Sequence, residues 1–213
     1  MAGQHELRTI EGYRGALLME RWLLGLMLLA LFPAQVFAQG GRHYVLLEFA
    51  SGGDELVNPD SGRSLRAGEL LQISYGYKFF SEDLPQWRVD LRAGSKLTMI
   101  DVDGGDAVFY RFPLELAFHR KLGDKFALGF GAAYHLTPNY RLETGPVDDS
   151  IDFDGAFGGF LHLEYQATEK FGFGLRYLKI DYEKEDNAFQ LPNGELTDKV
   201  DGSSVGGYVT YTF

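Results

Sequence analysis

The chain of 213 residues contains no cysteine, which excludes disulfides and any metal or nucleophile site built on a thiol. Positive charge is scarce: 20 Lys and Arg face 30 Asp and Glu, for a net charge of -10. Because phosphate binding needs concentrated positive charge, nucleic acid is not an expected partner. Prolines number only 7, whereas Gly (27), Tyr (12) and Phe (17) are abundant. This composition suits many short strands joined by turns, in one domain or at most two.

Long apolar runs are also rare, and one stands out near the N-terminus, at residues 22–38. Its unbroken apolar core, residues 23–32, is short for a membrane-spanning helix and fits the central region of a signal peptide. Small or branched residues, Val36 and Ala38, occupy the two positions that a signal peptidase reads. We therefore predict a signal peptide over 1–38, with cleavage after Ala38. A retained membrane anchor is the alternative, which the length and the cleavage site disfavour.

The residues before Met19 do not suit a signal peptide, whereas Met19-Glu20-Arg21 makes an ordinary start for one. A translation start at Met19 is the hypothesis that this pattern suggests. The charges within 1–38 cancel, so the predicted mature domain, 39–213, keeps the whole charge of -10.

Beyond Gln39 the apolar residues recur with a period of two, which is typical of strands whose two faces have different surroundings. In the clearest segment, Phe112 and Leu114 fall on one face, while Arg111 and Glu115 fall on the other. Eight segments follow this pattern, with approximate spans of 43–50, 69–80, 86–99, 108–120, 125–137, 156–166, 171–182 and 203–213.

The connections between these segments alternate in length. Short ones lie near 81–85, 121–124 and 167–170, and long polar ones lie near 51–68, 100–107, 138–155 and 183–202. An even number of strands, with turns at one end and loops at the other, is typical of outer-membrane barrels. We predict an all-β fold: an eight-stranded antiparallel up-and-down transmembrane β-barrel.

The size of the side chains indicates which face of the sheet points inward. Eight strands enclose only enough space for side chains to fill, and the apolar face is too bulky for that space. The opposite face is small or charged, so we place it inside and the apolar face against lipid. The segment 171–182 is an exception, because the same parity puts Lys179 and Asp181 outside. An end of the lipid band near Tyr177 explains this better than a bulge.

The chain ends on Val209-Thr210-Tyr211-Thr212-Phe213. With this terminus and the strand pattern, residues 43–213 resemble small outer-membrane β-barrels such as the OmpA transmembrane domain, OmpX and OmpW. The resemblance implies that Tyr211 and Phe213 form an assembly signal for the barrel assembly machinery, reached with the help of periplasmic chaperones. It also implies a monomer in the cell outer membrane, in contact with lipid and lipopolysaccharide.

The inward face carries the candidate functional residues. A salt-bridged interior that plugs a narrow barrel is the favoured interpretation, since buried charges need partners. The runner-up is a narrow pore, whose excess of cations would favour anions, or a passage for small molecules across the outer membrane. Three histidines, His119, His135 and His162, share this face. The predicted lumen charge network comprises Glu48, Lys78, Arg88, Asp90, Arg92, Lys96, Arg111, Glu115, Glu164 and Arg176.

Catalysis is the third interpretation, in the form of a lipid-modifying enzyme. Such a site needs a serine activated by histidine, and no His-x-Ser occurs; His135-Leu136-Thr137 is the nearest match. The acidic stretch 101–106 lacks the glycine and glutamate positions of a calcium-binding EF-hand loop. We expect no enzyme activity, no cofactor and no metal, and a structural or surface-interaction role.

Overall fold

The computed structural model describes residues 41–57, 64–102, 105–144, 147–185 and 199–213. The predicted signal peptide, its cleavage site and the Met19 start lie outside the described residues. No helix long and apolar enough to cross a membrane occurs in the part of the chain that the structure describes.

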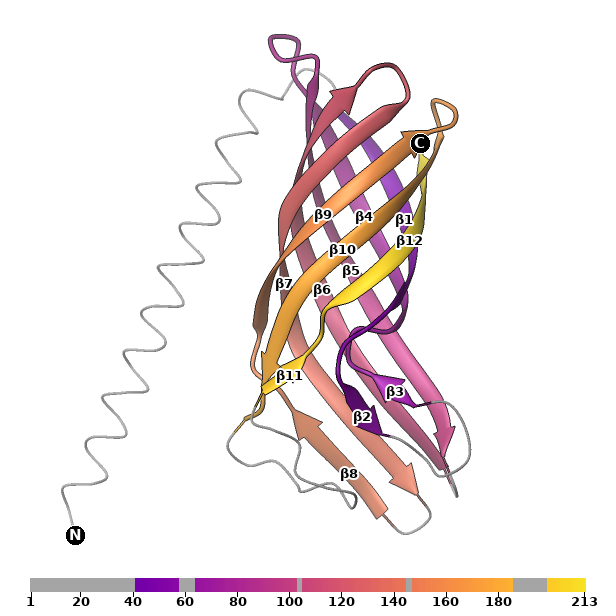
Figure 1. The fold of residues 1–213 in the computed structure, drawn as a ribbon, viewed down its shortest axis with the longest axis vertical. Coiled ribbons are helices and arrows are strands. Elements are labelled where there is room, and N and C mark those ends of the chain that lie inside the picture. Colours follow the sequence, from indigo (N-terminus) through magenta and orange to yellow (C-terminus); the bar gives the residue numbers. More distant parts are fainter. Residues whose placement is uncertain (1–40, 58–63, 103–104, 145–146, 186–198) are drawn as a thin grey trace, which may run out of the picture.

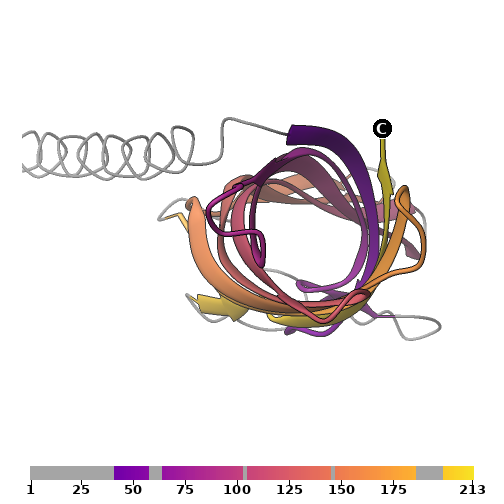
Figure 2. The same cartoon turned by 90° about the horizontal axis from the view of Figure 1, so that it is seen from above.

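Eight strands form a closed antiparallel barrel (Figures 1 and 2). Each pairs with the next barrel strand along the chain, and the last pairs with the first through Tyr44 opposite Thr212. The predicted fold is therefore confirmed. The barrel strands are β1 (Gly41–Ser51), β4 (Leu70–Phe80), β5 (Trp87–Val102), β6 (Gly105–Leu122), β7 (Phe126–Thr144), β9 (Ala156–Gln166), β10 (Phe171–Glu183) and β12 (Ser204–Thr212).

The two ends of the barrel differ. The turn end carries the connections β4–β5, β6–β7 and β9–β10, and the C-terminal Phe213 donates its backbone N–H there to the His43 carbonyl at 3.0 Å. The loop end carries four shorter strands: β2 (Glu55–Val57), β3 (Leu65–Arg66), β8 (Val147–Asp152) and β11 (Lys199–Asp201).

Alternating burial along the strands shows which face lies inside. On β6, Phe112 and Leu114 are each 45% exposed on the outer face, whereas Arg111 and Glu115 are buried inside. On β10, Lys179 lies on the outer face, and the pairing with β9 and β12 shows no register shift. No bulge therefore accounts for that exposed lysine.

Two predicted polar loops are instead strands. Residues 100–107 continue β5 and β6, with Val102 paired to Gly105, and 138–155 hold the end of β7 paired with β8. Between the aspartates of these segments lie buried apolar residues, such as Ile100, Ala107 and Ile151. As a result, strands β5 to β8 extend well beyond the rim of the barrel (Figure 1).

A β-bulge in β7 changes which residues face inward. Tyr110 pairs with Asn139, but Phe112 pairs with Leu136, so β7 carries one extra residue here. Thr137 adopts a φ of 41° at this point, in the left-handed region that bulges use. His135 is buried before the bulge, and the buried residues Tyr140 and Leu142 follow with the opposite parity.

Because of the bulge, Tyr140 and Leu142 join an apolar cluster that fills the loop end of the interior. The rings of Phe109, Phe153 and Tyr182 meet with centroids 5.5 to 6.2 Å apart. The interior thus differs from the sequence expectation of a charged lumen, since its loop end is apolar. We call the following residues the apolar plug: Phe109, Tyr140, Leu142, Ile151, Phe153, Leu178, Ile180 and Tyr182.

Candidate functional site: the barrel interior

The centre of the interior is built around Glu115 on β6. Its carboxylate accepts hydrogen bonds from Arg92 on β5, from Arg176 Nη2 at 2.7 Å and from Gln72 Nε2 at 3.2 Å. Arg176 also donates to Glu48 Oε2 on β1, at 2.8 Å. These ionic side chains are at most 2% exposed. A continuous chain of charge pairs therefore crosses the lumen from β1 to β5.

A second group of charges lies closer to the turn end. Arg88 donates two parallel hydrogen bonds to Glu164, at 2.9 and 3.1 Å, and its Nε lies 2.8 Å from Asp90 Oδ1. The other oxygen of Asp90 is 3.3 Å from His119 Nε2. The Tyr208 hydroxyl lies 3.3 Å from His162 Nδ1 and 3.5 Å from Glu164. The bidentate pairing of Arg88 with Glu164 fixes the orientation of both side chains and also neutralises their charges.

Two further cations are held by backbone oxygens. Lys96 Nζ donates to the Gly68 carbonyl at 2.9 Å, and Arg111 Nη2 donates to the Glu69 carbonyl at 3.3 Å. The Arg111 guanidinium also stacks on Phe109 of the apolar plug, 4.4 Å from the ring centroid, a favourable cation–π geometry. Leu70 follows with a φ of 89°, so a sharply bent backbone carries these carbonyls into the lumen.

All ten residues of the predicted charge network are buried. Ion pairs join seven of them, namely Glu48, Arg88, Asp90, Arg92, Glu115, Glu164 and Arg176. Lys96 and Arg111 use carbonyls, while Lys78 donates to Thr212 Oγ1 at 3.0 Å. Sequence reasoning missed the acceptors at Gly68 and Glu69, because backbone oxygens are not visible in a side-chain pattern.

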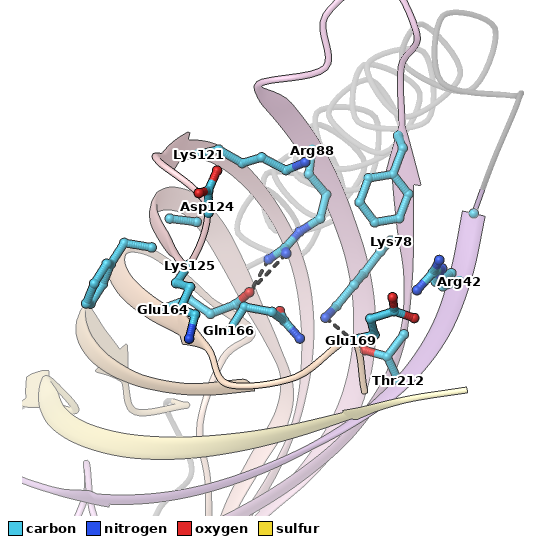
Figure 3. Close-up of a pocket in the computed structure, with 14 residues that line it drawn as sticks. Arg42, Lys78, Arg88, Lys121, Asp124, Lys125, Glu164, Gln166, Glu169 and Thr212 are labelled. Atoms are coloured by element: carbon cyan, nitrogen blue, oxygen red, sulfur yellow. Dashed lines mark hydrogen bonds and ion pairs between the residues drawn. The ribbon is translucent and has the colours of Figure 1, made fainter. Parts of the chain in front are cut away.

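The lumen opens at the turn end into a cavity of about 460 Å³ (Figure 3). The Arg88–Glu164 pair and the Lys78–Thr212 hydrogen bond line it. Towards the loop end, the charge pairs and then the apolar plug occupy the interior.

The residues of the predicted assembly signal lie on the outer face at the turn end. The Tyr211 ring contacts Phe213 edge-on, with centroids 5.3 Å apart, and also Phe171 at 5.0 Å. Phe213 is 64% exposed. The two aromatic residues therefore belong to an exposed aromatic patch and not to the lumen.

The structure does not bring together His135 and Thr137, the nearest match in the sequence to a histidine-activated nucleophile. His135 is buried and its Nδ1 lies 2.7 Å from the Tyr182 hydroxyl, whereas Thr137 is exposed at the bulge. Among the described ranges, no group of three or more His, Asp or Glu side chains is arranged to hold a metal ion.

Closed topology, an apolar outer face and a charged interior together define a small outer-membrane β-barrel. The chain belongs to the outer membrane protein β-barrel domain family, whose model matches residues 24–213. No curated protein matches the sequence.

Solved barrels share this fold at low sequence identity. Neisserial surface protein A superposes with a TM-score of 0.56 at 11% identity, covering 82% of this chain and 100% of that one. Ail, the attachment invasion locus protein of Yersinia pestis, was solved in complex with the heparin analogue sucrose octasulfate. It gives a TM-score of 0.53 at 10% identity, covering 81% of this chain and 97% of that one. At such identities the likeness is one of fold.

Proposed function

We propose that this protein is a monomeric, non-conducting barrel of the outer membrane with a structural or surface-interaction role and no enzymatic activity. The observation that carries the proposal is the filled interior. Charge pairs cross the middle of the lumen, and the apolar plug occupies its loop end. Moving an ion along this path requires breaking buried pairs and crossing an apolar layer, both of which are costly.

The loop end supports a role at the cell surface, because in this class the longer connections face outward and carry function. The solved relatives include a protein named for the surface and one named for attachment. In this chain the extended strands end among exposed carboxylates, including Asp101, Glu143, Asp152, Asp154 and Glu183. Such a surface favours a cationic partner, or lipopolysaccharide held to the carboxylates by bridging divalent cations. It disfavours a polyanion that binds directly.

Planar-bilayer recordings test the closed lumen. We expect the purified, folded protein to give no discrete conductance steps, because the plug and the charge pairs leave no hydrated path. A variant that combines Phe109→Ala, Phe153→Ala and Tyr182→Ala with Arg176→Ala removes three plug rings and also the guanidinium that joins Glu48 to Glu115. It serves as the matched control, with conductance expected to appear. Reproducible steps from the unaltered protein would support the runner-up function, a narrow pore.

We propose that the protein is exported through a signal peptide over residues 1–38, on the basis of the apolar run and the Val36-Phe37-Ala38 site. N-terminal sequencing of the membrane-extracted protein is expected to begin at Gln39. Substituting Met19→Leu should abolish production if translation starts there. A mature chain that begins before Met19 would contradict both parts of this proposal.

We propose that Tyr211 and Phe213 direct assembly through the barrel assembly machinery, because their rings are in contact at the end of the closing strand, where Tyr211 is half-buried and Phe213 is exposed. Phe213→Ala should reduce the amount of folded barrel several-fold in the outer membrane. Folded and unfolded forms are separated by their gel migration before and after boiling. Phe171→Ala removes a ring from the same aromatic patch and is the control. Equal losses in both variants would assign the effect to the patch and not to the terminus.

A further inference from the structure

A second feature of the interior, the cavity at the turn end, suggests a binding site on the opposite side of the membrane from the loops. Short turns of such barrels face the periplasm. Five cations and three carboxylates line this cavity of about 460 Å³. We propose that it binds a small oxyanion, a phosphate or carboxylate group, at the periplasmic mouth of the barrel.

The charges of the cavity do not cancel locally. Glu164 is engaged by both terminal nitrogens of Arg88, at 2.9 and 3.1 Å. Removing that pair leaves four cations, Arg42, Lys78, Lys121 and Lys125, against the two carboxylates Asp124 and Glu169. The protein as a whole has a net charge of -10, so this positive mouth runs against the overall balance.

Lys78 provides the floor of the site. It is 3% exposed, and its ammonium makes one hydrogen bond, to Thr212 Oγ1 at 3.0 Å, and lies 4.8 Å from the Tyr44 ring centroid. An ammonium has three donors, and among the described residues no carboxylate lies within ion-pair distance of Lys78. A buried cation without a carboxylate in direct contact is costly, and an oxyanion in the cavity would supply both that contact and the missing acceptors.

Figure 3 shows how the mouth surrounds this floor: Lys121 and Lys125 lie on one side of Lys78 and Arg42 on the other. The exposed rim cations would attract the anion by long-range electrostatics, and the buried ammonium would hold it. The ion pairs of the lumen close the path beyond the cavity, so a bound anion could leave only through the turn end. We therefore infer binding and not passage.

The volume exceeds that of one free ion, so the oxyanion has two sources: a free ion, or the charged group of a larger periplasmic molecule. Isothermal titration calorimetry of the folded protein in detergent micelles, with inorganic phosphate, acetate and glycerol 3-phosphate as probes, distinguishes them. Glycerol 3-phosphate binding at least tenfold tighter than phosphate would favour the larger molecule. Equal or weaker binding would favour the free ion.

Lys78→Met keeps the length of the side chain and removes the charge. We expect it to weaken phosphate binding at least tenfold, while Lys179→Met, which alters an exposed lysine at the loop end, leaves binding unchanged. Gel migration before and after boiling confirms that each variant folds. If Lys78→Met fails to fold, the rim variant Lys121→Met with Lys125→Met takes its place, with weaker binding expected. No detectable binding at millimolar phosphate, or binding unaffected by these changes, would overturn the site and leave the closed-barrel proposal intact.

Discussion

Replacing Glu115 by glutamine is expected to lower the free energy of unfolding by about 3–5 kcal/mol, the usual cost of breaking a buried ion pair. The Glu115 carboxylate serves two guanidiniums at once, those of Arg92 and Arg176. Glutamine has nearly the same shape but no charge, and its amide nitrogen would point a donor at one of them. Two buried cations would then share the single carboxylate of Glu48, which reaches only Arg176 in the structure.

Urea unfolding of the barrel in lipid vesicles measures this loss through the fluorescence of Trp87, the tryptophan at the start of β5. The control is Glu143→Gln, since Glu143 pairs with Arg141 at 2.8 Å but its side chain is 53% exposed. Exposed pairs contribute about 0–1 kcal/mol, so this variant should unfold close to the unaltered protein. If the two variants behave alike, water reaches Glu115 and the lumen is not dry at its centre.

Most of the barrel could be predicted because residues alternate between two faces with a period of two and these faces differ in chemistry. Along β6, Arg111 and Glu115 alternate with Phe112 and Leu114, so the register of the strand and the direction of its faces are readable together. The buried side of each strand then follows, because eight strands enclose only enough space for side chains to fill and the bulky apolar face of every strand together would overfill it.

The apolar plug could not be predicted in the same way, for two physical reasons. The bulge at Thr137 reverses the parity of β7, so Tyr140 and Leu142 turn inward where simple alternation puts their neighbours inside. The intervening aspartates also give 138–155 the composition of a loop, although β8 pairs there with β7. The alternation of side chains in a sequence assumes an unbroken strand, so it does not reveal where a bulge adds one residue.

Gly174→Val is expected to destabilise the barrel by about 1–3 kcal/mol or more, the range for overfilling a packed interior. Gly174 lies opposite Tyr208 in the β10–β12 pair, and a side chain at position 174 would occupy the space of the Tyr208 ring. That ring would have to move, which would break the contacts of its hydroxyl with His162 and Glu164. The same urea titration measures the change.

Gly207→Val provides a matched control on the same strand pair. Gly207 lies opposite Leu175 on the outer face, and the nearest atom to a side chain there is the Gly174 carbonyl oxygen at 3.9 Å. We expect this variant to be tolerated, and we expect Tyr208→Ala to relieve part of the cost of Gly174→Val, because neighbouring substitutions couple when they compete for one space. Equal stability of the Gly174→Val and Gly207→Val variants would mean that the Tyr208 ring moves freely. In that case packing would not require a glycine at position 174, and the Glu164 carboxylate would be held by Arg88 without the Tyr208 hydroxyl.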